Sequence, residues 1–141
     1  MCIRDSGKKS AKIVEQLKDL LGFGDFEPVV AVERESTAKP VPSKVMDDMR
    51  SCGAAIIHVS GEKRVIDQDG NELVMLNENV LIEIGAAMAL YGDRFILLVE
   101  EGVSLPSNLQ GLYVAEYQGA ELDQAATMKL LRAFKEFREQ S

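Results

Sequence analysis

The sequence contains very few of the residues that build covalent or metal-held frameworks. Its 141 residues include two cysteines, Cys2 and Cys52, one histidine, His58, and no tryptophan. Two cysteines make neither a disulfide framework nor a zinc site, so we expect a reducing, cytoplasmic environment. No apolar run approaches the roughly 20 residues of a membrane span, and no signal peptide opens the chain. We therefore predict no membrane contact.

Clustered positive charge is also missing. The 16 Lys and Arg residues are scattered through a chain whose formal net charge is −7. A surface that binds nucleic acid needs a stripe of basic residues, so we predict no contact with nucleic acid. The scattered charge does not exclude a local pocket that binds one small nucleotide. The length and the shares of hydrophobic (46%) and charged (28%) residues are typical of one globular domain.

The common catalytic and phosphate-binding motifs are absent as well. There is no Walker loop and no G-x-G-x-x-G segment after a strand, and no strand ends in an acidic cluster followed by a Lys-bearing loop, as in receiver domains. His58 is the only candidate base for a nucleophilic triad, and it lies inside an apolar strand rather than at a strand–helix elbow. We interpret His58 as a strand residue with a hydrogen-bonded imidazole.

What the sequence does contain is a regular alternation of helices and short apolar strands. Apolar residues at helical spacing predict helices over residues 9–21, 43–51, 79–90 and 122–138. Short apolar runs predict strands over residues 27–32, 54–59, 94–99 and 113–117, the last at a sheet edge. Polar loops over 33–42, 61–76 and 100–111 connect them, and the second has room for a small hairpin. The alternation predicts an open, doubly wound α/β domain, in which ligands bind beyond the carboxyl ends of the strands.

The first residues do not fit this alternation. Met1 to Ser6 has neither helical nor clear strand character, and it joins abruptly to the first predicted helix. We interpret residues 1–8 as a non-native or truncated start and residues 9–141 as the domain. In this interpretation the first strand of the sheet is truncated.

One acidic residue in the helix over 79–90 requires an explanation. Glu83 lies within an apolar run and has no basic residue three or four positions away to pair with it. The apolar stripe of this helix consists of Val80, Ile84, Ala87 and Met88. Helical periodicity alone favours a Glu83 side chain that points to solvent. The alternative is a carboxylate that faces a cleft.

A carboxylate in a cleft would have a definite chemistry here. Asn79 precedes Glu83 by one helical turn, so the two side chains are expected to meet. A carboxylate beside an amide can accept hydrogen bonds from both hydroxyls of a sugar diol. It can also stabilise the positive charge that builds on an anomeric carbon when a glycosidic bond breaks.

Three sequence blocks carry a resemblance to a known family. They are an N-V-x-x-E-x-G helix from Asn79 to Gly85, a glycine–arginine–apolar strand from Gly92 to Val99, and a P-S-N-L-Q-G loop from Pro106 to Gly111. In this order and spacing the blocks resemble the bacterial TIR-like predicted nucleotide-binding family, which includes the TIR halves of TIR–STING anti-phage effectors. The resemblance covers residues 9 to 117.

The resemblance implies a fold and an activity. The implied fold is a flavodoxin-like (TIR-like) open, mostly parallel sheet of four to five strands with helices on both faces. The implied activity is NAD⁺ cleavage to nicotinamide and ADP-ribose products, with NAD⁺ as substrate and without a metal or other cofactor. Glu83 falls on the family's catalytic glutamate. Asn79 occupies the place where animal TIR enzymes have a tryptophan.

The resemblance also implies further substrate-binding residues and partners. Ser6 and Gly7 would follow the first strand in the family's substrate-contacting loop, and Arg34 and Ser36 lie in the loop after the second strand. The family's first strand ends in an apolar run and a small or His-Gly turn, which Met1 to Asp5 replaces here. In the family a neighbouring protomer's loop completes the site, so we expect self-association and an upstream sensor domain or partner.

Three functions remain open from the sequence. The leading hypothesis is an NAD⁺ nucleosidase in bacterial defence or signalling. The first alternative is a non-catalytic TIR-like module that binds a nucleotide or scaffolds an assembly. The second alternative is a nucleoside deoxyribosyltransferase-like enzyme, in which the glutamate attacks the anomeric carbon as a covalent nucleophile. The P-S-N-L-Q-G block favours the TIR-like family over the transferase.

Overall fold

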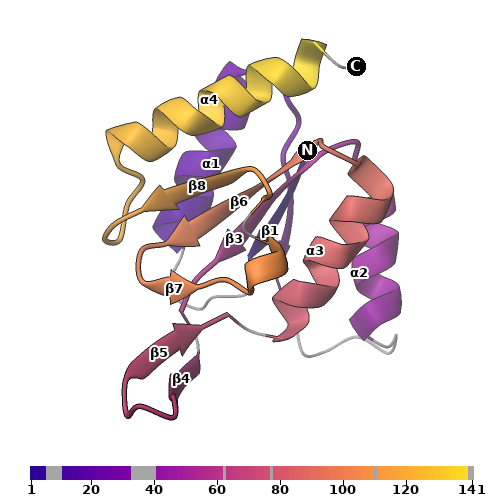
Figure 1. The fold of residues 1–141 in the computed structure, drawn as a ribbon. Helices are drawn as coiled ribbons and strands as arrows, with labels where there is room; N and C mark the ends of the chain where they lie inside the picture. Colours follow the sequence, from indigo (N-terminus) through magenta and orange to yellow (C-terminus); the bar gives the residue numbers. More distant parts are fainter. Residues whose placement is uncertain (6–10, 33–40, 62, 77, 110, 140–141) are drawn as a thin grey trace.

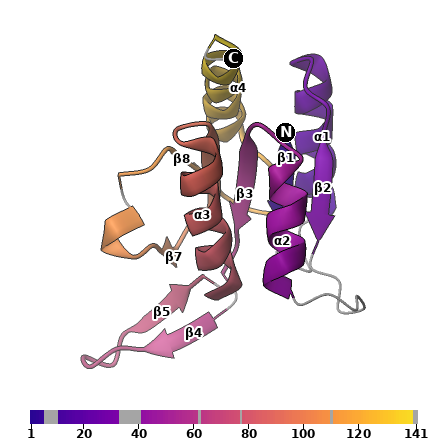
Figure 2. The ribbon, with the colours of Figure 1, turned by 90° about the vertical axis from the view of Figure 1, so that its right-hand side faces the viewer.

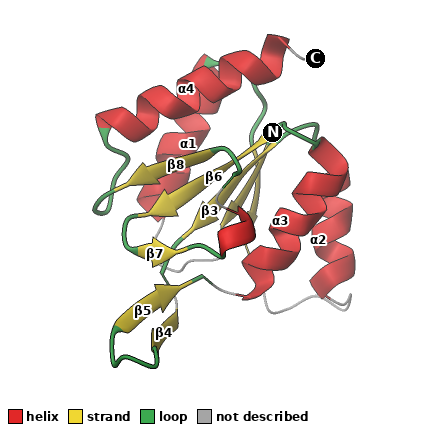
Figure 3. Cartoon of the chain, in the orientation of Figure 1, coloured by secondary structure: helices red, strands yellow, loops and turns green. Residues whose placement is uncertain are grey.

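The structure, a computed structural model, describes residues 1–5, 11–32, 41–61, 63–76, 78–109 and 111–139. Within these ranges the chain forms four α-helices: α1 (Ala11–Phe23), α2 (Val41–Arg50), α3 (Glu78–Tyr91) and α4 (Gln124–Glu139). The main sheet consists of β1 (Cys2–Asp5), β2 (Val29–Val32), β3 (Ala55–Val59), β6 (Phe95–Glu100) and β8 (Val114–Tyr117). A second sheet consists of β4 (Lys63–Ile66), β5 (Glu72–Met75) and β7 (Val103–Ser104), and a short 3-10 helix, η1 (Ser107–Leu109), precedes β8 (Figures 1 and 3).

The strands of the main sheet have the order β2-β1-β3-β6-β8, and every neighbouring pair is parallel. The chain extends the sheet first to one side of β1 and then to the other, so the switch in strand order lies between β1 and β3. The predicted open, parallel, flavodoxin-like sheet of five strands is confirmed. β8 lies at an edge of this sheet, as its sequence pattern predicts.

Helices cover both faces of the main sheet. α2 and α3 pack on one face, and α1 and α4 pack on the other (Figures 1 and 2). All five residues of β3 are buried, as expected for a parallel strand that is covered on both faces. Neighbouring side chains in a strand point to opposite faces, so β3 and β6 contribute to two separate apolar cores. No helix in the described part of the chain is both long and apolar enough to span a membrane.

The prediction that Met1 to Ser6 lacks strand character is wrong. Cys2–Asp5 forms β1, which pairs with β2 on one side and with β3 on the other. Arg4 interrupts the apolar pattern of this segment, and yet its side chain is buried because the fold supplies it with a carboxylate partner. Backbone pairing on both sides thus fixes a strand that the side-chain pattern does not indicate. The origin of residues 1–8 stays a prediction.

The predicted loop over residues 61–76, which has room for a small hairpin, contains one. β4 and β5 pair antiparallel around a turn, in which the Asp67 carboxylate accepts hydrogen bonds from the backbone N–H groups of Asp69 and Asn71. β7, from the next predicted loop, pairs with β5. The hairpin extends away from the main sheet (Figure 2).

Cys2 and Cys52 form a disulfide, with their Cα atoms 5.8 Å apart. The bond joins the start of β1 to a residue just after α2. Disulfides are rare in reducing compartments. The Cys2–Cys52 bond therefore differs from our expectation of a reducing environment, which we drew from the small number of cysteines.

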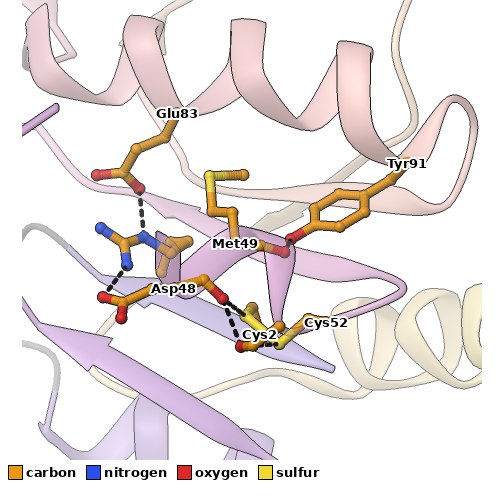
Figure 4. Close-up of polar contacts among 8 residues, drawn as sticks. Cys2, Asp48, Met49, Cys52, Glu83 and Tyr91 are labelled. Atoms are coloured by element: carbon orange, nitrogen blue, oxygen red, sulfur yellow. Dashed lines mark hydrogen bonds and ion pairs between the residues drawn. A yellow bond between two sulfur atoms is a disulfide. The ribbon is translucent and has the colours of Figure 1, made fainter. Parts of the chain in front are cut away.

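A buried hydrogen bond connects α3 to α2. The Tyr91 hydroxyl, at the end of α3, donates to the backbone carbonyl of Met49 in α2 at 2.5 Å (Figure 4). Burial raises the pKa of Tyr91 above its ordinary value of 10.0, and the positive charge of Arg4 opposes this shift. The folded chain therefore holds the phenol proton more tightly than the unfolded chain does.

We predict that Tyr91→Phe lowers the free energy of unfolding at pH 7 by about 1 kcal/mol, because one hydrogen bond is lost. The raised pKa implies that the contribution of Tyr91 is fully present below about pH 10 and is lost as the pH rises through the folded-state pKa. Stability should thus fall less steeply above pH 10 in the variant than in the unsubstituted chain. Urea unfolding between pH 7 and pH 11 measures both effects.

Tyr113→Phe is the matched control. Burial also raises the pKa of Tyr113, but its hydroxyl makes no hydrogen bond to the described residues. This control should reduce the alkaline loss of stability without a comparable cost at pH 7. Equal costs of the two variants at pH 7 would argue against the Tyr91–Met49 bond.

Candidate active site

Glu83 lies on the inner face of α3, toward the sheet. Its exposed fraction is 3%, and its neighbours on this face, Val80, Ile84 and Ala87, belong to the core between α3 and the sheet. The solvent-facing orientation that periodicity favoured is therefore wrong for Glu83. Met88, which we assigned to the same apolar stripe, instead points outward and is 51% exposed.

The partner of the Glu83 carboxylate comes from the central strand. The Arg4 Nε atom donates to Glu83 Oε2 at 3.1 Å, and both side chains are 4% exposed. Arg4 Nη1 lies 3.6 Å from Oδ2 of Asp48, a partly exposed residue of α2 (Figure 4). The three side chains thus form an acid–base–acid cluster between α2, α3 and β1.

One donor in this cluster has no hydrogen-bond acceptor. Arg4 Nη1 is buried and, among the described residues, no acceptor lies within hydrogen-bond distance. Its distance to Asp48 is that of an ion pair without a hydrogen bond. Buried N–H groups without an acceptor are rare in folded proteins. Arg4 Nη1 therefore favours the binding of a further acceptor oxygen at this site.

The cluster lies beside the switch in strand order. Arg4 is paired in register with Ile57 of β3, and β1 and β3 are the two strands between which the order reverses. Open α/β sheets bind ligands near this point, beyond the carboxyl ends of the strands. Glu83 is therefore held at the position where a flavodoxin-like fold accepts a ligand.

The other predicted site residues divide into two groups. Asn79 lies one turn before Glu83 in α3 and is exposed, whereas Glu83 is buried. The remaining substrate-binding candidates lie outside the described residues; they are Ser6, Gly7, Arg34 and Ser36.

His58 lies on the other face of the sheet from Glu83. Its neighbours Ile57 and Val59 point into the core under α3, so the His58 side chain points toward α1 and α4. There His58 Nε2 shares a hydrogen bond of 2.5 Å with the Tyr117 hydroxyl of β8. His58 is a strand residue with a hydrogen-bonded imidazole, as we interpreted it.

A comparison with models of protein families shows which family the chain belongs to. The model of the family described as "CAP12/Pycsar effector protein, TIR domain" matches residues 4–119, from within β1 to just beyond β8. The chain belongs to this family. The resemblance drawn from the three sequence blocks is thereby confirmed.

Solved structures support the fold of this TIR domain. Over 99% of the chain, it is similar to the Flv1 flavodiiron core from Synechocystis (6% identity, TM-score 0.59) and to a mutant flavo di-iron protein from Thermotoga maritima (17% identity, TM-score 0.53). It spans 36% and 35% of those two chains. A flavodoxin-like domain from Synechococcus matches with 10% identity and a TM-score of 0.50, over 99% of this chain and 96% of that one. At these identities the similarity shows the flavodoxin-like fold alone. A search of curated proteins gives no significant match.

A surface hollow near β8, at one edge of the main sheet, is separate from the cluster of Arg4, Asp48 and Glu83. It has a volume of about 600 Å³, and its lining includes Phe95 and Val114, the first residues of β6 and β8. The hollow therefore lies at the amino ends of the strands, where parallel sheets do not usually bind ligands. Among the described residues, no group of three or more His, Cys, Asp or Glu side chains is arranged to hold a metal ion.

Sequence reasoning found neither Arg4, the partner of Glu83, nor Asp48, the second acidic partner of Arg4. Arg4 is 79 residues away in the chain, and a search for basic residues one helical turn from Glu83 cannot detect it. Asp48 lies on the predicted second helix without any motif. The only available signal was an arginine next to apolar residues in the segment that we interpreted as a non-native start.

We predict that Arg4→Met destabilises the TIR domain by about 3 to 5 kcal/mol, because it leaves the buried Glu83 carboxylate without a compensating charge. The double variant Arg4→Met with Glu83→Met should recover much of this loss, since it replaces both charges by apolar groups of similar size. Denaturant unfolding of the single and double variants measures the coupling.

Asp48→Asn serves as the control for this cycle. The Asp48 side chain is 37% exposed, so its loss should cost no more than about 1 kcal/mol. A double variant whose loss equals the sum of the two single losses would contradict a direct Arg4–Glu83 interaction.

Proposed function

We propose that this TIR domain is an NAD⁺ nucleosidase, in which Glu83 acts on the nicotinamide ribose. The observation that carries the proposal is the position of Glu83. Among the acidic side chains whose burial the structure describes, it is the one buried acid, and it lies beside the switch point at which flavodoxin-like sheets bind ligands. It is also the glutamate of the N-V-x-x-E-x-G block.

The proposed reaction cleaves one bond and forms another. The bond between C1′ of the ribose and the nicotinamide nitrogen breaks, and its electron pair leaves with nicotinamide, which becomes neutral. A water oxygen then bonds to C1′, and the water releases one proton, so that the products are ADP-ribose, nicotinamide and H⁺. The Glu83 carboxylate accepts hydrogen bonds from the ribose hydroxyls and stabilises the positive charge on the ribose ring in the transition state.

The pairing with Arg4 is compatible with this role. A carboxylate has about four acceptor positions, and the Arg4 Nε bond occupies one of them. The buried Nη1 donor of Arg4 can in turn bind a hydroxyl or phosphate oxygen of the substrate. Asn79, Ser6, Gly7, Arg34 and Ser36 stay proposed substrate contacts.

We further propose a setting for this activity. The TIR domain would act in bacterial defence or signalling, in the cytoplasm, and would self-associate so that a neighbouring protomer completes the site. An upstream sensor domain or partner would control that association. The family match to an effector TIR domain supports the role in defence.

One observation favours a second function. Glu83 and Arg4 form a buried ion pair that resembles a structural contact between α3 and β1. In this alternative the domain binds a nucleotide or scaffolds an assembly without cleaving NAD⁺. Glu83 would then contribute to stability alone.

We predict that Glu83→Gln lowers kcat/KM for NAD⁺ cleavage at least about 100-fold, since an amide cannot stabilise the developing positive charge. The measurement is chromatographic detection of nicotinamide at high protein concentration. Glu116→Gln, on the exposed side of β8, is the matched control and should keep full activity. Thermal unfolding confirms that both variants fold.

Three outcomes separate the functions. Nicotinamide release that persists in Glu83→Gln contradicts the catalytic role of Glu83. NAD⁺ binding by calorimetry without any turnover in the unsubstituted chain favours the non-catalytic module. Exchange of the base with free adenine, without net hydrolysis, favours the deoxyribosyltransferase-like reaction.

A further inference from the structure

The proposed cleavage of NAD⁺ leaves one proton without an assigned acceptor. A water molecule that bonds to C1′ must lose a proton, and a positioned side chain that takes this proton is a general base. Glu83 is poorly placed for this task, because its side chain is 4% exposed and its Oε2 atom accepts the hydrogen bond from Arg4 Nε. A second carboxylate at the site would divide the work, as the two carboxyl groups of glycosidases do.

Asp48 is the second carboxylate of the cluster that contains Arg4 and Glu83. α2, which carries Asp48, and α3, which carries Glu83, pack on the same face of the main sheet. Asp48 Oδ2 lies 3.6 Å from Arg4 Nη1, and Glu83 Oε2 lies 3.1 Å from Arg4 Nε, so the two carboxylates are one guanidinium group apart (Figure 4). Glycosidases that activate a water molecule separate their two carboxyl groups by roughly 6.5–9.5 Å, which leaves room for that water. A guanidinium group holds Asp48 and Glu83 at a comparable separation.

The surroundings of the two carboxylates suit two different tasks. The Asp48 side chain is 37% exposed, so a proton that it takes up can pass on to bulk water. The Glu83 side chain is buried, and a buried charge acts more strongly on a developing positive charge than it does in water. Paired carboxyl groups divide acid–base and electrostatic roles according to such differences in environment. The environments therefore favour electrostatic stabilisation by Glu83 and proton transfer by Asp48.

Arg4 Nη1 provides a place for the attacking water. This donor is buried, and no acceptor among the described residues lies within hydrogen-bond distance of it. Its distance of 3.6 Å to Asp48 Oδ2 is too long for a direct hydrogen bond and short enough for one oxygen atom to contact both groups. A water that accepts a hydrogen bond from Arg4 Nη1 can therefore donate one to Asp48.

We propose that Asp48 is a second catalytic residue of this TIR domain, the general base that takes a proton from the attacking water. The inference rests on the proposed cleavage of NAD⁺. The water oxygen bonds to C1′ of the ribose, the bond from C1′ to the nicotinamide nitrogen breaks, and its electron pair leaves with nicotinamide. One water proton passes to the Asp48 carboxylate, which becomes a carboxylic acid and then releases the proton to solvent.

A neutral pyridine base separates the role of Asp48 from that of Glu83. Its ring nitrogen attacks C1′ with a lone pair and carries no proton that must be removed, so this attack needs no general base. It still needs Glu83, because the same positive charge develops on the ribose ring. Loss of the Asp48 carboxylate should therefore stop hydrolysis and spare base exchange, whereas loss of the Glu83 carboxylate should stop both reactions.

The test compares hydrolysis with base exchange. The full chain is incubated with NAD⁺, with and without 3-acetylpyridine, and chromatography separates ADP-ribose from the 3-acetylpyridine analogue of NAD⁺. We expect Asp48→Asn to lower kcat for ADP-ribose formation at least about 100-fold, with an unchanged KM and no fall in the rate of exchange. Glu83→Gln should lower the rates of both reactions together.

Asp47→Asn is the matched control for this test. Asp47 precedes Asp48 in α2, and its side chain is 52% exposed and lies 3.8 Å from Arg50 Nη1, so this variant should keep both reactions. Thermal unfolding confirms that each variant folds. Hydrolysis that persists in Asp48→Asn, or an equal loss of hydrolysis and exchange, overturns the role of Asp48 and leaves the proposed role of Glu83 in place. An unsubstituted chain that releases no nicotinamide overturns the proposed function and this inference together.

Discussion

The position of β1 in the middle of the main sheet is the constraint on which the rest of the structure depends. Its four residues form parallel ladders with β2 and β3 at once. Without them, β2 would have no neighbour in the sheet, and the backbone groups of β3 would lose their partners on one side. β1 also sets the place of Arg4, and through Arg4 it provides the buried partner of Glu83. One short strand thus connects the sheet topology to the chemistry of the site.

α3 carries two acidic residues, Glu78 at its first position and Glu83 on its inner side. On the inner side, Glu83 is surrounded by core residues and needs Arg4, since an unpaired carboxylate in such a place costs several kcal/mol.

The sequence predicts the fold well and the site only in part. Periodicity and apolar runs place the four helices, four of the five main strands and the edge position of β8, because burial on both faces of a parallel sheet produces those patterns. β1 is missed, since the charge of Arg4 breaks the pattern and its compensation comes from Glu83, far along the chain. The orientation of Glu83 cannot be obtained from periodicity for the same reason. Motif order identifies Glu83 as a candidate site residue, while its contact with Arg4, and that of Arg4 with Asp48, require the tertiary structure.

The central claim is that the Glu83 carboxylate binds the nicotinamide ribose. A crystal structure of the full chain with a non-cleavable NAD⁺ analogue tests it most directly, through the distances between the Glu83 carboxylate oxygens and the ribose hydroxyls. We predict hydrogen bonds of about 2.6–3.2 Å, with the analogue on the α2 and α3 side of the sheet. An analogue bound elsewhere, such as in the hollow lined by Phe95 and Val114, or one whose ribose does not touch Glu83, would contradict the claim.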